Sequence, residues 1–63
     1  MNIIKELRIK NSMKQYEVAE KIGMSKRQYL KYENEQIKPN YKFVSKISAL
    51  YNIDIKELII RLF

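Results

Sequence analysis

The stretch VAEKIGMSKRQYLKYEN, residues 18–34, carries the only glycine of a 63-residue chain, Gly23, between two segments of helical period. Before Gly23, apolar side chains recur at the three- and four-residue spacing of an amphipathic helix, and glycine can adopt the left-handed conformation that ends such a helix. After it, Ser25 suits the N-cap of a new helix, and Gln28 stands where a capping box needs it. The stretch therefore predicts two helices joined by a tight turn at Gly23.

The same patterns continue on both sides of this stretch and predict a helical protein. One glycine and one proline leave few places for turns, and apolar residues recur at helical spacing. Asn40 is a plausible N-cap for a fourth helix, and Asp54 with Glu57 forms a second capping box that begins a fifth. The expected helices lie at about residues 2–10, 15–22 and 26–34, then after Asn40, and from Asp54 to the chain end. We expect an all-α fold, a compact five-helix bundle formed by one domain over residues 1–63.

Composition and charge exclude some classes of protein. Thirteen Lys and Arg residues against seven Asp and Glu residues give a net charge of +6, which favours a polyanionic partner, with nucleic acid first and an acidic membrane second. No apolar run approaches the roughly 20 residues of a membrane span, and no signal-peptide core follows Met1. The sequence has no cysteine and no histidine, which fits a cytoplasmic protein and leaves neither a disulfide nor a zinc site of the usual kind.

Catalysis has little support in the sequence. The chain lacks a His or Cys for acid–base or nucleophilic chemistry, a glycine-rich phosphate loop and a carboxylate pair with a credible pocket. We expect no enzymatic activity, no cofactor and no metal. Two readings stay open beside nucleic-acid binding: a protein-interaction module, and a basic amphipathic protein of membrane surfaces, although the regular caps and turns favour a folded globule.

Six sequence features follow one another along the chain. They are the opening IIKELR at residues 3–8, then Gln15, Ala19 and Gly23 at steps of four, GMS at 23–25, YEN at 32–34, Pro39, and NIDIKEL at 52–58. In this order and spacing the chain resembles the lambda-repressor-like, or Cro/XRE-type, helix-turn-helix DNA-binding family over nearly its whole length. The resemblance implies a transcriptional regulator, expected to be a repressor, that binds a palindromic operator in double-stranded DNA as a homodimer. An antitoxin or anti-repressor partner that uses the same frame is the alternative.

The resemblance also implies which residues meet DNA. The helix over residues 26–34 would lie in the major groove, as the second helix of the motif does. The expected base contacts are Lys26, Arg27, Gln28 and Lys31. The expected phosphate contacts are Lys14, Gln15, Asn34, Lys38 and Asn40. Gln28 has a competing role, because its amide can close the capping box on Ser25.

Two pairs of residues have expected roles away from the bases. The resemblance places an ion pair between Arg8 and Glu33, where a planar guanidinium suits a partly buried carboxylate. Ile60 and Phe63 belong to a terminal helix that is apolar nearly all round and needs a cover. We therefore expect these two side chains in a dimer interface.

Three positions depart from the family pattern. Lys14 replaces the common Ser or Thr N-cap, so it loses a cap and gains a charge that can meet a phosphate. Glu35 stands where a glycine often follows Glu-Asn, and it puts a negative charge near the DNA. Leu30 stands where a polar residue is usual, and it either touches a thymine methyl group or extends the core.

Overall fold

The computed structural model describes residues 2–63, which form five α-helices and no strand. The helices are α1 (Ile3–Lys10), α2 (Gln15–Lys21), α3 (Lys26–Glu33), α4 (Tyr41–Tyr51) and α5 (Ile55–Leu62). The first three begin and end within one residue of the predicted bounds. The all-α prediction is therefore confirmed.

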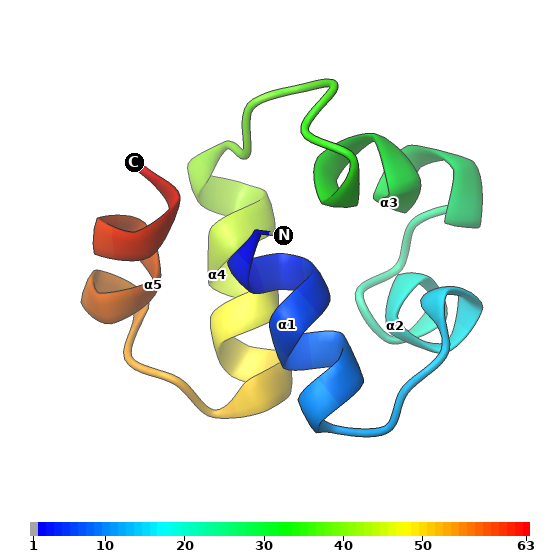
Figure 1. Cartoon of the computed structure of the whole chain (residues 1–63), viewed down its shortest axis with the longest axis horizontal. Helices are drawn as coiled ribbons and strands as arrows, with labels where there is room; N and C mark the ends of the chain where they lie inside the picture. The colour runs from blue at the N-terminus through cyan, green and yellow to red at the C-terminus, as the bar shows by residue number, and fades with distance from the viewer. Residues whose placement is uncertain (1) are drawn as a thin grey trace.

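The helices pack around a single core. Figure 1 shows α4 behind α1, with α5 on one side of this pair and α2 and α3 on the other. Helix α2 packs against α3, α4 packs against α5, and α1 contacts both α3 and α5. The buried apolar side chains are Ile3, Ile4, Leu7, Val18, Ala19, Ile22, Tyr29, Tyr32, Phe43, Val44, Ile47 and Leu58. The core thus draws on every helix, and the Tyr32 ring of α3 stacks on the Phe43 ring of α4 at 3.8 Å between centroids.

Side-chain caps begin four of the helices. Ser25 Oγ accepts a hydrogen bond from the Gln28 backbone N–H at 3.1 Å, and Asn40 Oδ1 accepts one from the Phe43 N–H at 2.8 Å, as their positions predicted. Asp54 departs from its expected capping box, because its carboxylate accepts from the Lys56 N–H, one residue earlier than the box requires. Such a bond still satisfies one of the free N–H groups of the first turn.

Asn2 caps two helices with one side chain. Its Oδ1 accepts a hydrogen bond from the Lys5 N–H in the first turn of α1, at 3.1 Å. Its Nδ2 donates to the backbone oxygens of Tyr32 and Glu33, at 3.1 and 3.2 Å, where carbonyls in the last turn of α3 have no partner within the helix. Asn2 thereby joins the start of α1 to the end of α3.

Four helices are followed, within two residues of their last residue, by a position with a positive φ angle. Gly23 follows α2 with φ +75°, and the Gly23 and Met24 N–H groups bond back to Glu20 and Ala19 as a Schellman motif. A Cβ atom on Gly23 would meet nothing within 4 Å, so the turn requires glycine for its backbone angle rather than for space. The other three positions are Ser12, Glu35 and Asn52, with φ of 55°, 59° and 54°.

We expect Glu35→Gly to stabilise the protein. A left-handed non-glycine residue costs about 1–2 kcal/mol, and the added freedom of glycine in the unfolded chain takes back about 0.4–1 kcal/mol. The net gain of about 0.5–1 kcal/mol should raise the melting temperature by a few degrees, since about 1 kcal/mol shifts a domain of this size by about 4–8 °C. Thermal melts followed by circular dichroism measure this shift.

A matched glycine substitution provides the control for this prediction. Glu20 is also exposed, but it lies inside α2, where glycine destabilises by roughly 0.5–1 kcal/mol. Glu20→Gly should therefore lower the melting temperature. A Glu35→Gly variant that melts below the wild type would show that the left-handed turn carries no strain.

Candidate nucleic-acid interface

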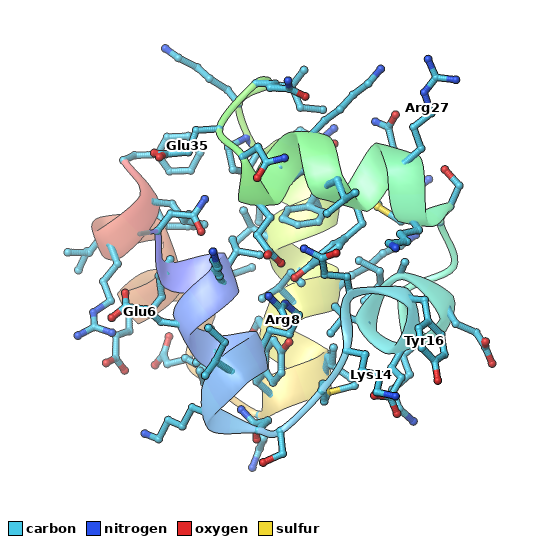
Figure 2. All side chains as sticks on the ribbon, turned by 45° about the vertical axis from the view of Figure 1, so that its right-hand side comes forward. Glu6, Arg8, Lys14, Tyr16, Arg27 and Glu35 are labelled. Carbon is cyan, nitrogen blue, oxygen red and sulfur yellow. The ribbon has the colours of Figure 1, made fainter. Side chains whose placement is uncertain are left out.

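The outer face of α3 gathers cationic side chains around an open hollow. The hollow has a volume of about 660 Å³ and is lined by Lys26, Arg27, Leu30, Lys31, Asn34 and Gln36. The α3 members are spaced by three and four residues, so they share one side of the helix. In Figure 2, Arg27 projects from α3 away from the body of the molecule. The lining has three cations and no carboxylate, so this face attracts anions.

The structure places the expected base contacts unequally. Lys26, Arg27 and Lys31 line the α3 hollow, whereas Gln28 does not. The Gln28 backbone N–H bonds to Ser25, but within residues 2–63 its side-chain amide makes no bond that closes the capping box. Leu30 lines the hollow although Gln28 does not. Its position three residues after Arg27 places it on the same side of the helix. Gln36 also lines the hollow but was not among the expected contacts. It lies in the loop after α3, where helical periodicity gives no signal.

The expected phosphate contacts lie on three different segments. Lys14, Asn34, Lys38 and Asn40 are exposed. Asn40 uses its Oδ1 to cap α4, so its amide nitrogen is the group that can donate to a phosphate. Lys14 has its Nζ 6.0 Å from the centre of the Tyr16 ring, and Figure 2 shows both side chains at the same corner of the molecule.

The start of α2 has more support than the expected loss of a cap at Lys14 would leave it. Lys14 has no acceptor to offer, but the Glu17 carboxylate accepts a hydrogen bond from the Lys14 backbone N–H at 2.8 Å. This is half of a capping box. The helix start is therefore held from the Glu17 side alone, and the Lys14 side chain is left to interact elsewhere.

Glu35 lines a second hollow rather than the α3 hollow. This second hollow has a volume of about 620 Å³ and is lined by Asn2, Ile3, Glu6, Tyr32, Glu35, Ile37, Lys38, Pro39, Arg61 and Leu62. The two hollows have no residue in common. Figure 2 shows Glu35 at the opposite end of the molecule from Arg27. Glu35 therefore shares its hollow with Lys38 and Arg61, whereas its sequence neighbours Asn34 and Gln36 line the α3 hollow.

Arg8 and Glu33 form a buried ion pair that joins α1 to α3. Arg8 Nε lies 3.0 Å from Glu33 Oε2, and Arg8 Nη2 donates to Glu33 Oε1 at 3.0 Å. The side chains are 13% and 1% exposed. Arg8 Nη1 also donates to the Met13 carbonyl, so the guanidinium holds the turn after α1 as well. This bidentate geometry is the one that Arg supplies and Lys cannot.

The neighbours of Glu33 determine its protonation. Burial by itself raises the pKa of this carboxyl, but the hydrogen bonds that it accepts, led by those from Arg8, outweigh burial and hold the pKa below its ordinary value. Gln15 Nε2 donates to the same carboxylate at 3.3 Å. A residue expected to meet a phosphate is therefore held by the buried ion pair.

Two tyrosine hydroxyls are buried near this pair. Tyr29 of α3 has no exposed surface, Tyr51 of α4 is half-buried, and neither hydroxyl has a hydrogen-bond partner among residues 2–63. Burial raises the pKa of Tyr29 well above its ordinary value, and it raises the pKa of Tyr51 to about 12. Both side chains therefore favour the neutral form.

Helix α5 leaves apolar side chains uncovered. Ile60 is 78% exposed and Phe63 is 70% exposed, whereas Leu58 on the opposite side of the helix is buried. These two side chains therefore form an uncovered apolar surface on α5. None of the helices in residues 2–63 combines the length and the apolar character required to cross a membrane.

Comparison with known proteins identifies relatives of this fold. The profile of a helix-turn-helix family matches residues 4–58. Over 56 residues the chain is 38% identical to a Vibrio cholerae protein, the cryptic phage CTXphi transcriptional repressor RstR. That alignment covers 89% of this chain and 50% of RstR, so the chain spans half the length of this relative. No solved structure matches the chain.

Proposed function

The chain belongs to the Cro/XRE-type helix-turn-helix family, and from this membership we propose that it is a sequence-specific regulator of transcription that binds double-stranded DNA. The observation that carries the proposal is the outer face of α3, where Lys26, Arg27 and Lys31 surround a hollow that no carboxylate lines. The name of the Vibrio cholerae relative supports repression rather than activation. Residues 1–63 would act as one DNA-binding domain in the cytoplasm, without enzymatic activity or a cofactor.

Helix α3 would lie in the major groove. Its N-terminal residues then reach base edges, where Arg27 suits guanine and the Gln28 amide suits adenine, with Lys26 and Lys31 beside them. Lys14, Gln15, Asn34, Lys38 and Asn40 would hold phosphates on either side. Contacts of this second kind set the position of a protein on DNA, and the base contacts supply the sequence information.

Gln15 can reach a phosphate without leaving Glu33. A glutamine amide nitrogen has two N–H donors, and the bond to Glu33 Oε1 uses one of them. The other remains for a phosphate oxygen. The buried ion pair would therefore orient the Gln15 amide before DNA arrives, which lowers the entropy lost on binding.

A homodimer would make the DNA site palindromic. Ile60 and Phe63 offer the exposed apolar surface for a twofold interface on α5. Two α3 helices related by such an axis enter major grooves about 34 Å, or about 10 base pairs, apart. Each half-site then repeats the sequence that one copy recognises.

The first test compares two classes of alanine variant. Arg27→Ala should weaken binding to a site selected from random duplexes by about 1–3 kcal/mol, and it should relax specificity at one base pair of that site. Lys38→Ala should weaken binding to selected and scrambled duplexes alike, and should reduce the slope of log affinity against log salt by about 0.9. Fluorescence anisotropy across a salt series measures both effects.

The control for this test is Lys10→Ala. Lys10 is exposed in the last turn of α1 and has no expected contact with DNA, so its removal should leave specificity unchanged. Equal losses for Arg27→Ala on both duplexes would mean that α3 holds phosphates only. A wild-type protein that binds no duplex would favour the alternative, a protein-interaction module such as an antitoxin or anti-repressor partner.

The dimer has a separate test. We expect sedimentation to show a dimer at micromolar concentration, and we expect Phe63→Asp to weaken it at least tenfold, because an unpaired carboxylate would be buried in the interface. Ile9→Asp is the control and should leave the dimer unchanged. Ile9 is also an exposed apolar side chain, 52% exposed, but it lies on α1 rather than on α5. A wild-type protein that stays monomeric at high concentration, with and without DNA, would refute the proposal.

A further inference from the structure

Leu30 is an apolar side chain without a structural role in the core. It is half-buried on α3, but it belongs neither to the buried core nor to the partly buried apolar side chains that pack against that core. The second interpretation of its sequence position, an extension of the core, therefore has no support. Leu30 instead lines the α3 hollow, where the other five lining residues are polar or charged.

The position of Leu30 restricts what it can meet. Arg27, Leu30, Lys31 and Asn34 share one side of α3, so any polyanion that the cations hold will bring its own surface against Leu30. The edges of DNA bases in the major groove carry donors and acceptors at most positions. The C5-methyl group of thymine is the apolar group among them, and apolar side chains contact it.

We propose that Leu30 is a specificity-determining residue that recognises the C5-methyl group of a thymine in each DNA half-site. The inference rests on the proposed function, since it requires α3 to enter the major groove. It adds a base preference that the cationic side chains do not provide. A cytosine or a uracil in the same place would leave the Leu30 side chain without its apolar partner.

Replacement of single thymines tests the inference. After a binding site has been selected from random duplexes, each thymine is replaced in turn by deoxyuridine, which removes one methyl group and preserves base pairing. For the wild type we expect one thymine per half-site whose replacement lowers affinity about fourfold, the value that corresponds to one buried methyl group. For Leu30→Ala we expect equal affinity for the two duplexes at that position.

Control variants separate this effect from a general loss of binding. Arg27→Ala should bind more weakly yet keep the difference between thymine and deoxyuridine, and Ile9→Ala should leave both quantities unchanged. Leu30→Gln keeps a side chain of similar length without apolar character, so it should lose the difference as Leu30→Ala does. Circular dichroism checks that each variant is folded, and Leu30→Gln provides the answer if Leu30→Ala does not fold.

The possible failures are distinguishable. A wild-type protein that selects no duplex contradicts the proposed function itself. A selected site at which no thymine can be distinguished from deoxyuridine overturns the Leu30 inference alone. The same holds if a thymine preference persists in both Leu30 variants, because another residue would then recognise the methyl group.

Discussion

Glu33→Ala should leave the protein largely unfolded at room temperature. The substitution removes the carboxylate that Arg8 meets with two hydrogen bonds and leaves a guanidinium that is 13% exposed without its partner. Removal of one member of a buried ion pair costs about 3–5 kcal/mol, and a domain this small has a total stability of about 3–5 kcal/mol. Urea titration or a thermal melt followed by circular dichroism measures the loss.

An exposed carboxylate provides the comparison. Glu57→Ala removes an acidic residue on the surface of α5 and should change stability by less than about 0.5 kcal/mol. Arg8→Ala should resemble Glu33→Ala, because it leaves a carboxylate that is 1% exposed without its strongest donor. The ion pair would have no structural importance if Glu33→Ala melted within error of the wild type.

Acid should act on the same pair. Because the folded pKa of Glu33 lies below its ordinary value, its contribution to stability is fully present above the unfolded pKa of about 4.3 and is lost as the pH falls through the folded pKa. In acid the stability of the wild type should therefore fall toward that of the Glu33→Ala variant. The variant has no carboxylate at this position, so its own stability should not show this acid-dependent loss.

Alkaline solution should unfold the protein through Tyr29 and Tyr51. Both have a folded pKa above the unfolded value of about 10. Their contribution to stability is therefore fully present below about pH 10 and is lost as the pH rises toward the folded values. Above about pH 10 and below the folded pKa values, both tyrosines are ionised in the unfolded chain but neutral in the folded chain. Over that range the free energy of unfolding should fall by about 2.7 kcal/mol per pH unit.

Two optical signals measure alkaline unfolding. The tyrosinate absorbance of the buried residues should rise together with the loss of helical circular dichroism, because Tyr29 ionises only once the chain opens. Tyr29→Phe keeps the fully buried ring, so it should fold at neutral pH, and it should have a shallower pH dependence by about 1.4 kcal/mol per unit. Tyr41→Phe, at a residue that is 71% exposed, is the control. Helices that persist while all five tyrosines ionise would contradict the prediction.

The helices were predictable because their ends carry local chemical signals. Gly23, Ser25 and Asn40 act through bonds within a few residues, so sequence spacing is sufficient to find them. The turns at Ser12 and Glu35 were not predictable in this way, because neither residue favours a left-handed backbone. Backbone N–H groups of Ser12 and Glu35 and of the residues after them bond back to the preceding helix at both turns, and the residue types at these positions do not indicate those bonds.

The candidate interface was predictable in part for the same reason. The face made by Lys26, Arg27 and Lys31 follows from helical periodicity once the start of α3 is known. The bond between Gln15 and Glu33 crosses from one helix to another, and no local pattern indicates it. Leu30 stayed open between two roles until the structure showed which apolar side chains reach the core.

The double cap formed by Asn2 links the local motions of two distant segments. Its amide joins the first turn of α1 to the last turn of α3, thirty residues along the chain. Fraying of the first turn of α1 therefore also releases the carbonyls at the end of the helix that carries the α3 hollow. Amide protons in the two turns should then exchange with solvent through a shared opening rather than independently. In this protein, the order of α3 therefore depends on a side chain at the second residue of the chain.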